Sequence, residues 1–227
     1  MRNKASFIRK APCFQGADAA SIQELAEVTE VKRVARRAPL WVAGDRRRVL
    51  VLVRSGIIRE TAQISDHVVT LGFFGRNELV GGEVAFGFAP GGSAEAYEDS
   101  VVLQFPARTV RTLLERDPGI ASSLARGETE RRFEIQQRMG MVAHRTAPQR
   151  LASCFLALAK RFGVRDSRGT IVNLRLTHKE MASYIGATRE TVSFAVTDMR
   201  REGLIETEGK RVVLLDRPAL TALSAGG

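Results

Sequence analysis

Three side chains near the C-terminus, Arg189, Glu190 and Ser193, carry groups that could read the edges of DNA bases. An arginine fork donates to guanine O6 and N7, a carboxylate accepts from cytosine N4, and a hydroxyl pairs with either kind of group. All three would face outward at the start of one helix. This combination is typical of a helix that enters the major groove. Because any surface helix carries charged side chains, the surrounding segment must supply further evidence.

Two predicted helices and a tight turn would position these side chains. Thr177 is a good N-cap, and Glu180 completes a capping box for a first helix. Gly186 ends that helix at a position that tolerates a positive φ, and Thr188 caps the second helix. The apolar positions expected to face inward are Met181, Ala182 and Ile185, then Val192, Ala195, Val196 and Met199. The segment therefore predicts a helix-turn-helix.

A predicted hairpin follows the second helix at residues 202–215. Gly209 marks the turn between two short strands, and Lys210 and Arg211 lie near its tip. A basic wing beside a helix-turn-helix is suited to contact phosphates. We therefore expect a winged helix.

The composition is that of a globular, basic protein. The 227 residues are enough for two domains of ordinary size, and 44% hydrophobic with 26% charged residues excludes a disordered chain. The formal net charge is +10, and residues 147–227 carry the largest share of the excess. A positive excess around the predicted reader is expected for attraction to phosphates.

An anionic membrane would also attract a basic chain, but the sequence shows no basic amphipathic anchor and no apolar run of transmembrane length. Residues 1–10 lack the apolar core of a signal peptide. Cys13 and Cys154 are far apart and form neither a disulfide framework nor a metal-binding pattern. We expect a soluble, cytoplasmic protein with no membrane partner and no bound metal.

The region before residue 118 reads as a short helix, then many short strands, and from Arg108 a second short helix that ends at Asp117. Asp18 would cap the first helix, whose predicted inner face is Ile22, Leu25 and Val28. Apolar runs separated by glycine turns then follow at residues 49–53, 57–62, 68–73, 94–97 and 100–105. This spacing predicts an antiparallel β-barrel or a double-sheet jelly roll.

A long helix is predicted after Asp117. Its apolar seam consists of Ile120, Leu124, Ile135, Met139 and Val142. The seam could pack on the chain's own β domain, but it has little local core to cover it, and we favour pairing with a second copy in a coiled-coil-like homodimer. The predicted class is α+β, with a β-roll at 1–118, a dimerisation helix at 119–146 and a winged helix-turn-helix at 147–227.

Roll, long helix and winged helix in this order resemble the Crp/Fnr family of bacterial transcription regulators, named for the cyclic AMP receptor protein and the fumarate-nitrate regulator. The resemblance covers nearly the full chain, and Thr-Arg-Glu-Thr-Val-Ser at 188–193 closely resembles the family's recognition helix. The turn residues Gly44-Asp45, Ser55-Gly56, Gly75 with Glu78, and Gly82-Glu83 resemble the scaffold of its cyclic-nucleotide-binding roll. The resemblance implies a homodimer on pseudo-palindromic double-stranded DNA, with RNA polymerase as a further partner.

The resemblance also implies roles for single residues. Arg189 and Glu190 would contact a G·C pair, and Ser193 a neighbouring base or a phosphate. Phe194 occupies a position where many relatives have a second DNA-reading arginine; it could touch a thymine methyl or pack internally. Thr177 and His178 would contact the DNA backbone, and Lys210 would lie on the wing. The full predicted DNA-binding set is Thr177, His178, Thr188, Arg189, Glu190, Ser193, Phe194 and Lys210.

Departures from the family pattern argue against its known ligands. Relatives that bind cyclic AMP carry an Arg-Ser pair about ten residues after the Gly-Glu, whereas this chain has Gly92-Ser93. Burying a cyclic phosphate without a cation lacks compensation, so cyclic AMP is not the expected effector. Cys13 stands alone where oxygen-sensing relatives have an iron–sulfur cysteine cluster, and the lone His67 is weak evidence for haem. No cofactor is predicted.

The effector, if one exists, is therefore unknown. Its candidate contacts are Glu83, Ser93 and Arg131. The alternative class is an enzyme or small-molecule carrier whose C-terminal domain is a packing module. The three histidines are scattered, and the sequence has no glycine-rich phosphate loop and no paired His/Cys/carboxylate motif. We expect a regulator that is not an enzyme.

Overall fold

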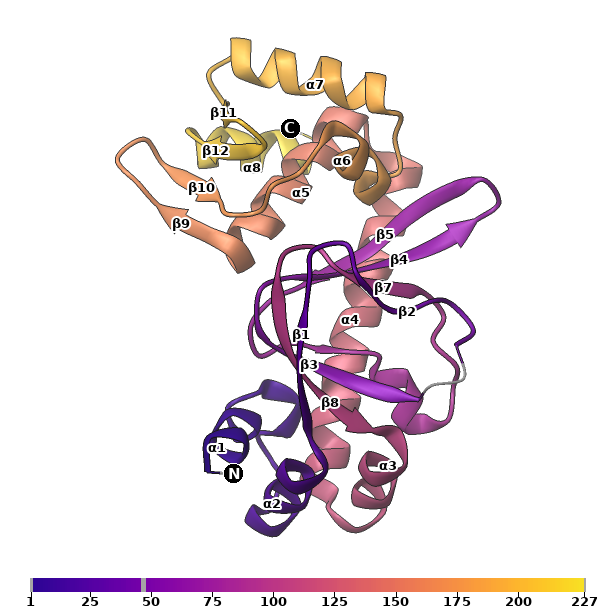
Figure 1. Cartoon of the computed structure of the whole chain (residues 1–227). Coiled ribbons are helices and arrows are strands. Elements are labelled where there is room, and N and C mark those ends of the chain that lie inside the picture. The colour runs from indigo at the N-terminus through magenta and orange to yellow at the C-terminus, as the bar shows by residue number, and fades with distance from the viewer. Residues whose placement is uncertain (1, 46–47, 227) are drawn as a thin grey trace. The chain divides into compact units, whose positions relative to one another are not determined.

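The computed structural model describes residues 2–45 and 48–226 of the chain. The chain forms two compact units, Met1–Glu134 and Ile135–Gly227. The division falls inside one long helix, α4 (Pro118–His144), which follows the predicted range of 119–146 closely (Figure 1). The prediction of three domains, with boundaries after residues 118 and 146, stays a prediction.

The first unit is built on two antiparallel sheets of four strands. One has the strand order β1-β8-β3-β6 and the other β2-β7-β4-β5 (Figure 1). The strands are β1 (Glu30–Val34), β2 (Pro39–Trp41), β3 (Val49–Ser55), β4 (Ile58–Ile64), β5 (His67–Phe74), β6 (Leu79–Val80), β7 (Ser93–Ala96) and β8 (Ser100–Pro106). The double-sheet roll expected from the short strands and glycine turns is thus confirmed.

Strand β3 shows how this unit builds two cores. Successive side chains of a strand point to opposite faces. Val51 and Val53 belong to the apolar cluster between the two sheets, whereas Leu50 and Leu52 belong to a second cluster that contains the helices. All four side chains are fully buried, which explains why the sequence of this strand is continuously apolar.

The helical segments of this unit contribute to the second core. They are α1 (Arg2–Arg9), η1 (Pro12–Phe14), α2 (Ala19–Val28), η2 (Gly82–Phe86), α3 (Ala107–Arg116) and the first part of α4. Asp18 is the N-cap residue of α2, as predicted, and Ile22 and Leu25 face the core. The prediction for Val28 was wrong, since this side chain is 38% exposed. At 100° per residue, Val28 lies well off the stripe formed by Ile22, Leu25 and Ala26.

The start of α4 is fixed by the carboxylate of Asp117. Its Oδ1 accepts the backbone N–H groups of Gly119 at 3.0 Å and Ile120 at 3.2 Å, and its Oδ2 accepts that of Asp18 at 2.9 Å. Ile120 and Leu124 are completely buried in the core of the first unit. These two residues were wrongly assigned to the exposed seam, because the roll itself supplies the apolar surface that covers them.

The second unit contains the predicted helix-turn-helix and wing. Beyond the end of α4, its helices are α5 (Ala147–Phe162), α6 (His178–Ile185), α7 (Arg189–Arg201) and α8 (Arg217–Ala225). Its antiparallel sheet has the order β11-β12-β10-β9, with β9 (Gly163–Arg165), β10 (Thr170–Val172), β11 (Ile205–Glu208) and β12 (Arg211–Leu214). The wing hairpin β11–β12 is confirmed. Strands β9 and β10 were not predicted, because three-residue strands are too short to show alternation.

Within the described ranges of the chain, no helix is both long enough and apolar enough to cross a membrane.

Candidate nucleic-acid interface

Local hydrogen bonds hold the turn of the helix-turn-helix. The Thr177 N–H donates to Glu180 Oε2 at 2.7 Å, and the Glu180 N–H donates to Thr177 Oγ1 at 3.3 Å, which completes the predicted capping box. Gly186 ends α6 with a φ of 66°, and a Cβ added there would lie 3.2 Å from Val142 Cγ2. Both the left-handed backbone and the close packing therefore favour glycine at this turn.

Buried apolar residues set the rotation of α7 about its axis. Val192, Ala195, Val196 and Met199 are almost completely buried. The opposite side of the helix consequently exposes Arg189, Glu190 and Phe194, with Ser193 partly exposed. The Thr188 hydroxyl accepts the N–H of Thr191 at 3.1 Å, so Thr188 orients the first turn.

An open groove of about 490 Å³ lies between the two helices of the motif and the wing. Four of the predicted DNA-binding residues line it: Thr177, His178, Arg189 and Lys210. They come from the start of α6, the start of α7 and the β11–β12 turn, so the fold gathers residues that are up to 33 positions apart. Glu190, Ser193 and Phe194 are not among the lining residues and continue along the outer side of α7.

Two further basic side chains line the groove but were not among the predicted contacts. Lys179 follows His178 in the first turn of α6, and Arg211 begins β12 beside Lys210. The sequence could have indicated both side chains, because each directly follows a residue of the predicted DNA-binding set. With them, the groove has four cationic side chains, which suits a phosphate backbone.

A group of ion pairs connects the wing to the β9–β10 hairpin. Arg168 Nη1 lies 3.3 Å from Glu206 Oε2, and its Nη2 lies 3.0 Å from Glu208 Oε2 and 2.8 Å from Asp166 Oδ2. The two glutamates belong to β11, where their charges would repel phosphates. Arg168 offsets this repulsion, and hydrogen bonding to Asp166 and Glu208 raises the pKa of its guanidinium. The sequence alone did not reveal this group.

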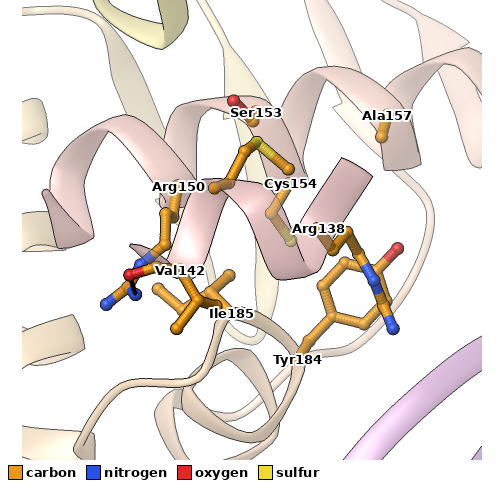
Figure 2. A pocket seen from close by; sticks show the side chains of 9 residues that line it. Arg138, Val142, Arg150, Ser153, Cys154, Ala157, Tyr184 and Ile185 are labelled. Atoms are coloured by element: carbon orange, nitrogen blue, oxygen red, sulfur yellow. Dashed lines mark hydrogen bonds between the residues drawn. The ribbon is translucent and has the colours of Figure 1, made fainter. Parts of the chain in front are cut away.

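A small cavity of about 50 Å³ lies where the end of α4 meets α5 and α6 (Figure 2). The Arg138 guanidinium stacks over the Tyr184 ring at 4.2 Å, and Arg150 Nη1 donates to the Val142 carbonyl at 3.3 Å. Cys154 is completely buried in its wall, and burial raises the pKa of its thiol to about 12, which makes it unreactive. The cavity has room for roughly one or two water molecules and is far below the size of a ligand pocket. The side chains around it pack the end of α4 and helix α5 against α6.

The three candidate effector contacts in the first unit each have partners within the chain, and their role in ligand binding stays a prediction. Ser93 Oγ accepts the Ala43 N–H at 3.0 Å. The Glu83 carboxylate, in η2, accepts a backbone hydrogen bond from Gly91 and repels the carboxylate of Glu128 in α4. Burial and then the charge of Glu83 raise the pKa of Glu128 to about 7. Arg131 forms an ion pair with Glu60. Arg131 is thus paired with Glu60, while Glu83 and Ser93 both accept backbone N–H groups.

The Glu60–Arg131 ion pair is the most buried charge pair of the roll. The Glu60 side chain is 2% exposed, and the Arg131 guanidinium also stacks over the Phe74 ring at 4.7 Å. A buried carboxylate requires such a partner. The Arg131 charge is therefore already used inside the chain.

Gly92 is the residue that the sequence resemblance aligns with the arginine expected in cyclic-AMP-binding relatives. A Cβ added to Gly92 would lie 2.6 Å from the backbone oxygen of Thr61, so the neighbouring strand leaves no room for a side chain without a backbone shift. Among the described residues, moreover, no cluster of three or more His, Cys, Asp or Glu side chains could hold a metal ion.

Two family models match the chain. Residues 149–223 match the Crp-like helix-turn-helix domain, and residues 31–117 match the cyclic nucleotide-binding domain. The first match contains α6, α7 and the wing, and the second contains all eight strands of the roll except the first residue of β1. The two matched models thus correspond to the helix-turn-helix with its wing and to the roll.

Relatives cover most of the chain. The transcriptional activator protein anr of Pseudomonas aeruginosa is 32% identical over 189 residues, which are 82% of this chain and 77% of that protein. The electron transport regulator A of Shewanella oneidensis is 25% identical over 210 residues, which are 91% of this chain and 84% of that protein.

Solved structures show the same fold. A Crp-family transcriptional regulator from Thermus thermophilus aligns with a TM-score of 0.72 and 28% identity, covering 86% of this chain and 96% of that one. The c-di-GMP responsive global regulator CLP of Xanthomonas campestris aligns with a TM-score of 0.76 over 88% of this chain and 100% of that one; its 22% identity supports the fold alone. This chain therefore belongs to the Crp/Fnr family of transcription regulators, with a cyclic-nucleotide-binding-like domain and a DNA-binding helix-turn-helix.

Proposed function

We propose that this protein is a sequence-specific regulator that binds pseudo-palindromic double-stranded DNA as a homodimer and has no enzymatic activity. One observation carries the proposal. Thr177, His178, Arg189 and Lys210 line one groove, and the next turn of α7 is exposed beside it. A phosphate backbone fits such a basic groove, and a helix with an exposed, mixed polar face fits the adjacent major groove.

The chemistry of each residue indicates whether it contacts a phosphate or a base. Lys210, Thr177 and His178 contact phosphates from the groove. Arg189 donates to guanine and Glu190 accepts from the cytosine of the same or a neighbouring pair. Ser193, which is partly exposed on the outer side of α7, contacts a further base or phosphate.

Homodimerisation is proposed through the C-terminal part of α4. Ile135, Met139 and Val142 follow the 3.5-residue spacing of a helical seam, and Met139 is 67% exposed. Pairing this face with a second copy would remove its apolar surface from water and set two α7 helices at the spacing of two half-sites.

The roll is proposed to work without cyclic AMP. Gly92 provides no cation for the phosphate, and the Arg131 charge is neutralised by Glu60. Any effector that uses Glu83, Ser93 or Arg131 has to compete with bonds that these residues already make within the chain. We further propose that the protein acts in the cytoplasm, where a regulator that activates transcription also contacts RNA polymerase.

The proposal is tested by selecting bound sequences from random duplex DNA with purified protein, with and without added cyclic AMP. The expected product is a two-fold symmetric motif whose half-sites are about one helical turn apart. Cyclic AMP is expected to leave the motif and its enrichment unchanged. Recovery of only salt-dependent binding that is equal for all sequences would contradict a sequence-specific regulator.

A further inference from the structure

Phe194 is the most exposed large apolar side chain in the part of the chain that the structure describes, at 74%. It lies in the middle of α7, a helix whose other apolar residues are almost all buried. An exposed phenylalanine on an otherwise polar surface indicates contact with something outside the chain. Internal packing, which the sequence left open for this residue, does not occur.

The helical register defines what Phe194 faces. It follows Glu190 by four residues and precedes Thr197 by three, so these three side chains lie on one stripe of α7. The buried positions Val192 and Val196 lie on the other side of the helix. Phe194 therefore points in the same direction as Glu190, which the proposed function assigns to base reading.

The surroundings of Phe194 suit a small apolar partner. Its exposed helical neighbours are polar: Glu190, Thr191, Thr197 and Asp198. A protein surface that packed on α7 would have to cover these polar groups along with one isolated ring. A base pair demands less, because the only apolar group that the major groove presents is the C5-methyl of thymine.

We propose that Phe194 is a specificity-determining residue that selects thymine by contacting its C5-methyl group, at a base pair next to the one read by Glu190. The inference rests on the proposed function, since it requires α7 to enter the major groove. The inference predicts that the operator has an obligatory T·A pair in each half-site. This preference would come from an apolar contact and not from charge or hydrogen bonding.

The test removes the methyl group from the DNA and the ring from the protein, separately and together. Each thymine of the selected operator is replaced in turn by deoxyuridine, which lacks the methyl, and affinity is measured by fluorescence anisotropy. Wild-type protein is expected to lose about three- to five-fold in affinity per half-site at one thymine only, the effect of losing one methyl contact. Phe194→Ala is expected to bind the thymine operator with a similar loss and to be insensitive to deoxyuridine at that position.

A matched control is Phe88→Ala, which removes a phenylalanine that is 67% exposed but belongs to the first unit. This variant is expected to keep the full sensitivity to deoxyuridine. Far-ultraviolet circular dichroism and a thermal melt of each variant check that the fold is retained, as expected when an exposed side chain is removed.

The outcomes separate this inference from the proposed function. Absence of any sequence preference in the wild-type protein would contradict the proposed function itself. Specific binding that is indifferent to deoxyuridine at every thymine would overturn the role of Phe194 alone. That role would also be overturned if Phe194→Ala kept the full sensitivity to deoxyuridine, since another residue would then contact the methyl.

Discussion

The outer side of α7 and the inside of the roll treat their functional side chains in opposite ways. Arg189, Glu190 and Phe194 are exposed on a helix whose rotation is fixed by a buried face. In the roll, by contrast, Arg131 is paired with the buried Glu60, and the Ser93 hydroxyl accepts a backbone N–H group. One surface is arranged for an external partner, and the other satisfies its charges internally.

This difference shows how the two halves of a regulator can diverge separately. The DNA-binding unit has the capped helices of a helix-turn-helix, which the family model matches, and a groove lined by basic side chains. The roll has two four-stranded sheets and matches the cyclic nucleotide-binding domain, but Gly92 has no room for a side chain and Arg131 is held in an ion pair. The roll can therefore have the sheets of a cyclic nucleotide-binding domain without the side chains that bind the nucleotide.

The largest effect is expected when the Glu60–Arg131 ion pair inside the roll is removed. Arg131→Ala leaves the Glu60 charge buried without its guanidinium, which should destabilise the first unit by about 3–5 kcal/mol. Urea unfolding followed by the fluorescence of Trp41 measures this, because Trp41 is the single tryptophan and is buried in the roll. Arg132→Ala, an exposed arginine on the same helix, is the control and should change stability by less than about 0.5 kcal/mol. Equal stability of the two variants would show that the pair is not needed.

The DNA-binding surface is tested by separating base contacts from phosphate contacts. Arg189→Ala should cost about 1–3 kcal/mol at the selected operator while barely changing non-specific binding. Lys210→Ala should weaken binding to all sequences and reduce the salt slope by about one. Titrations of operator and scrambled duplexes at several salt concentrations give both quantities. Equal losses on both duplexes for Arg189→Ala would refute its assignment as a base reader.

The raised pKa of Glu128 predicts a dependence of stability on pH. Its folded-state pKa is about 7 against an ordinary 4.5, so the unfolded chain releases this proton first as the pH rises. The contribution of Glu128 to stability is therefore most favourable below about pH 4.5 and becomes less favourable up to about pH 7. Glu128→Gln should remove the decrease and stabilise the first unit by about 1–3 kcal/mol at pH 8, with little effect at pH 4.5.

Trp41 fluorescence during unfolding at the two pH values is the measurement for Glu128→Gln. Glu130→Gln, an exposed glutamate on the same helix, is the matched control and should leave the pH profile unchanged. A profile for Glu128→Gln that matches the wild type would mean that another group titrates in this range.

The smallest effect is expected at the wing. Arg168→Ala would leave Glu206 and Glu208 without their cation and should reduce DNA affinity about two- to five-fold at low salt. The loss should fade at high salt, since all these side chains are at least partly exposed. Arg165→Ala on the same hairpin serves as the control for general loss of positive charge. If both variants lose affinity equally, Arg168 acts as a simple cation and not through the wing.

The sequence predicted the helix-turn-helix scaffold better than the interactions inside the roll, for a physical reason. Thr177, Glu180 and Gly186 act on neighbours within a few residues, so capping and turn chemistry are visible as local patterns. The Glu60–Arg131 pair joins positions 71 residues apart, and only the fold brings them together. No local pattern could reveal that this arginine is used internally.

Two further differences have the same origin. Ile120 and Leu124 read as part of a helical seam because periodicity cannot tell which surface covers an apolar stripe. The Arg168 group was missed because it depends on the pairing of β9–β12 into one sheet, and the strands β9 and β10 have three residues each. Both the burial of Ile120 and Leu124 and the ion pairs of Arg168 depend on residues that are distant in the sequence.

The central claim is that α7 reads bases from the major groove while the roll needs no cyclic nucleotide. Methylation interference on the selected operator, without cyclic AMP, tests this claim most directly, because a methyl on guanine N7 projects into the major groove. We predict that methylation of one guanine in each half-site blocks binding of the wild-type protein, and that Arg189→Ala no longer distinguishes this guanine. A bound fraction with the same methylation pattern as the free DNA would contradict the claim.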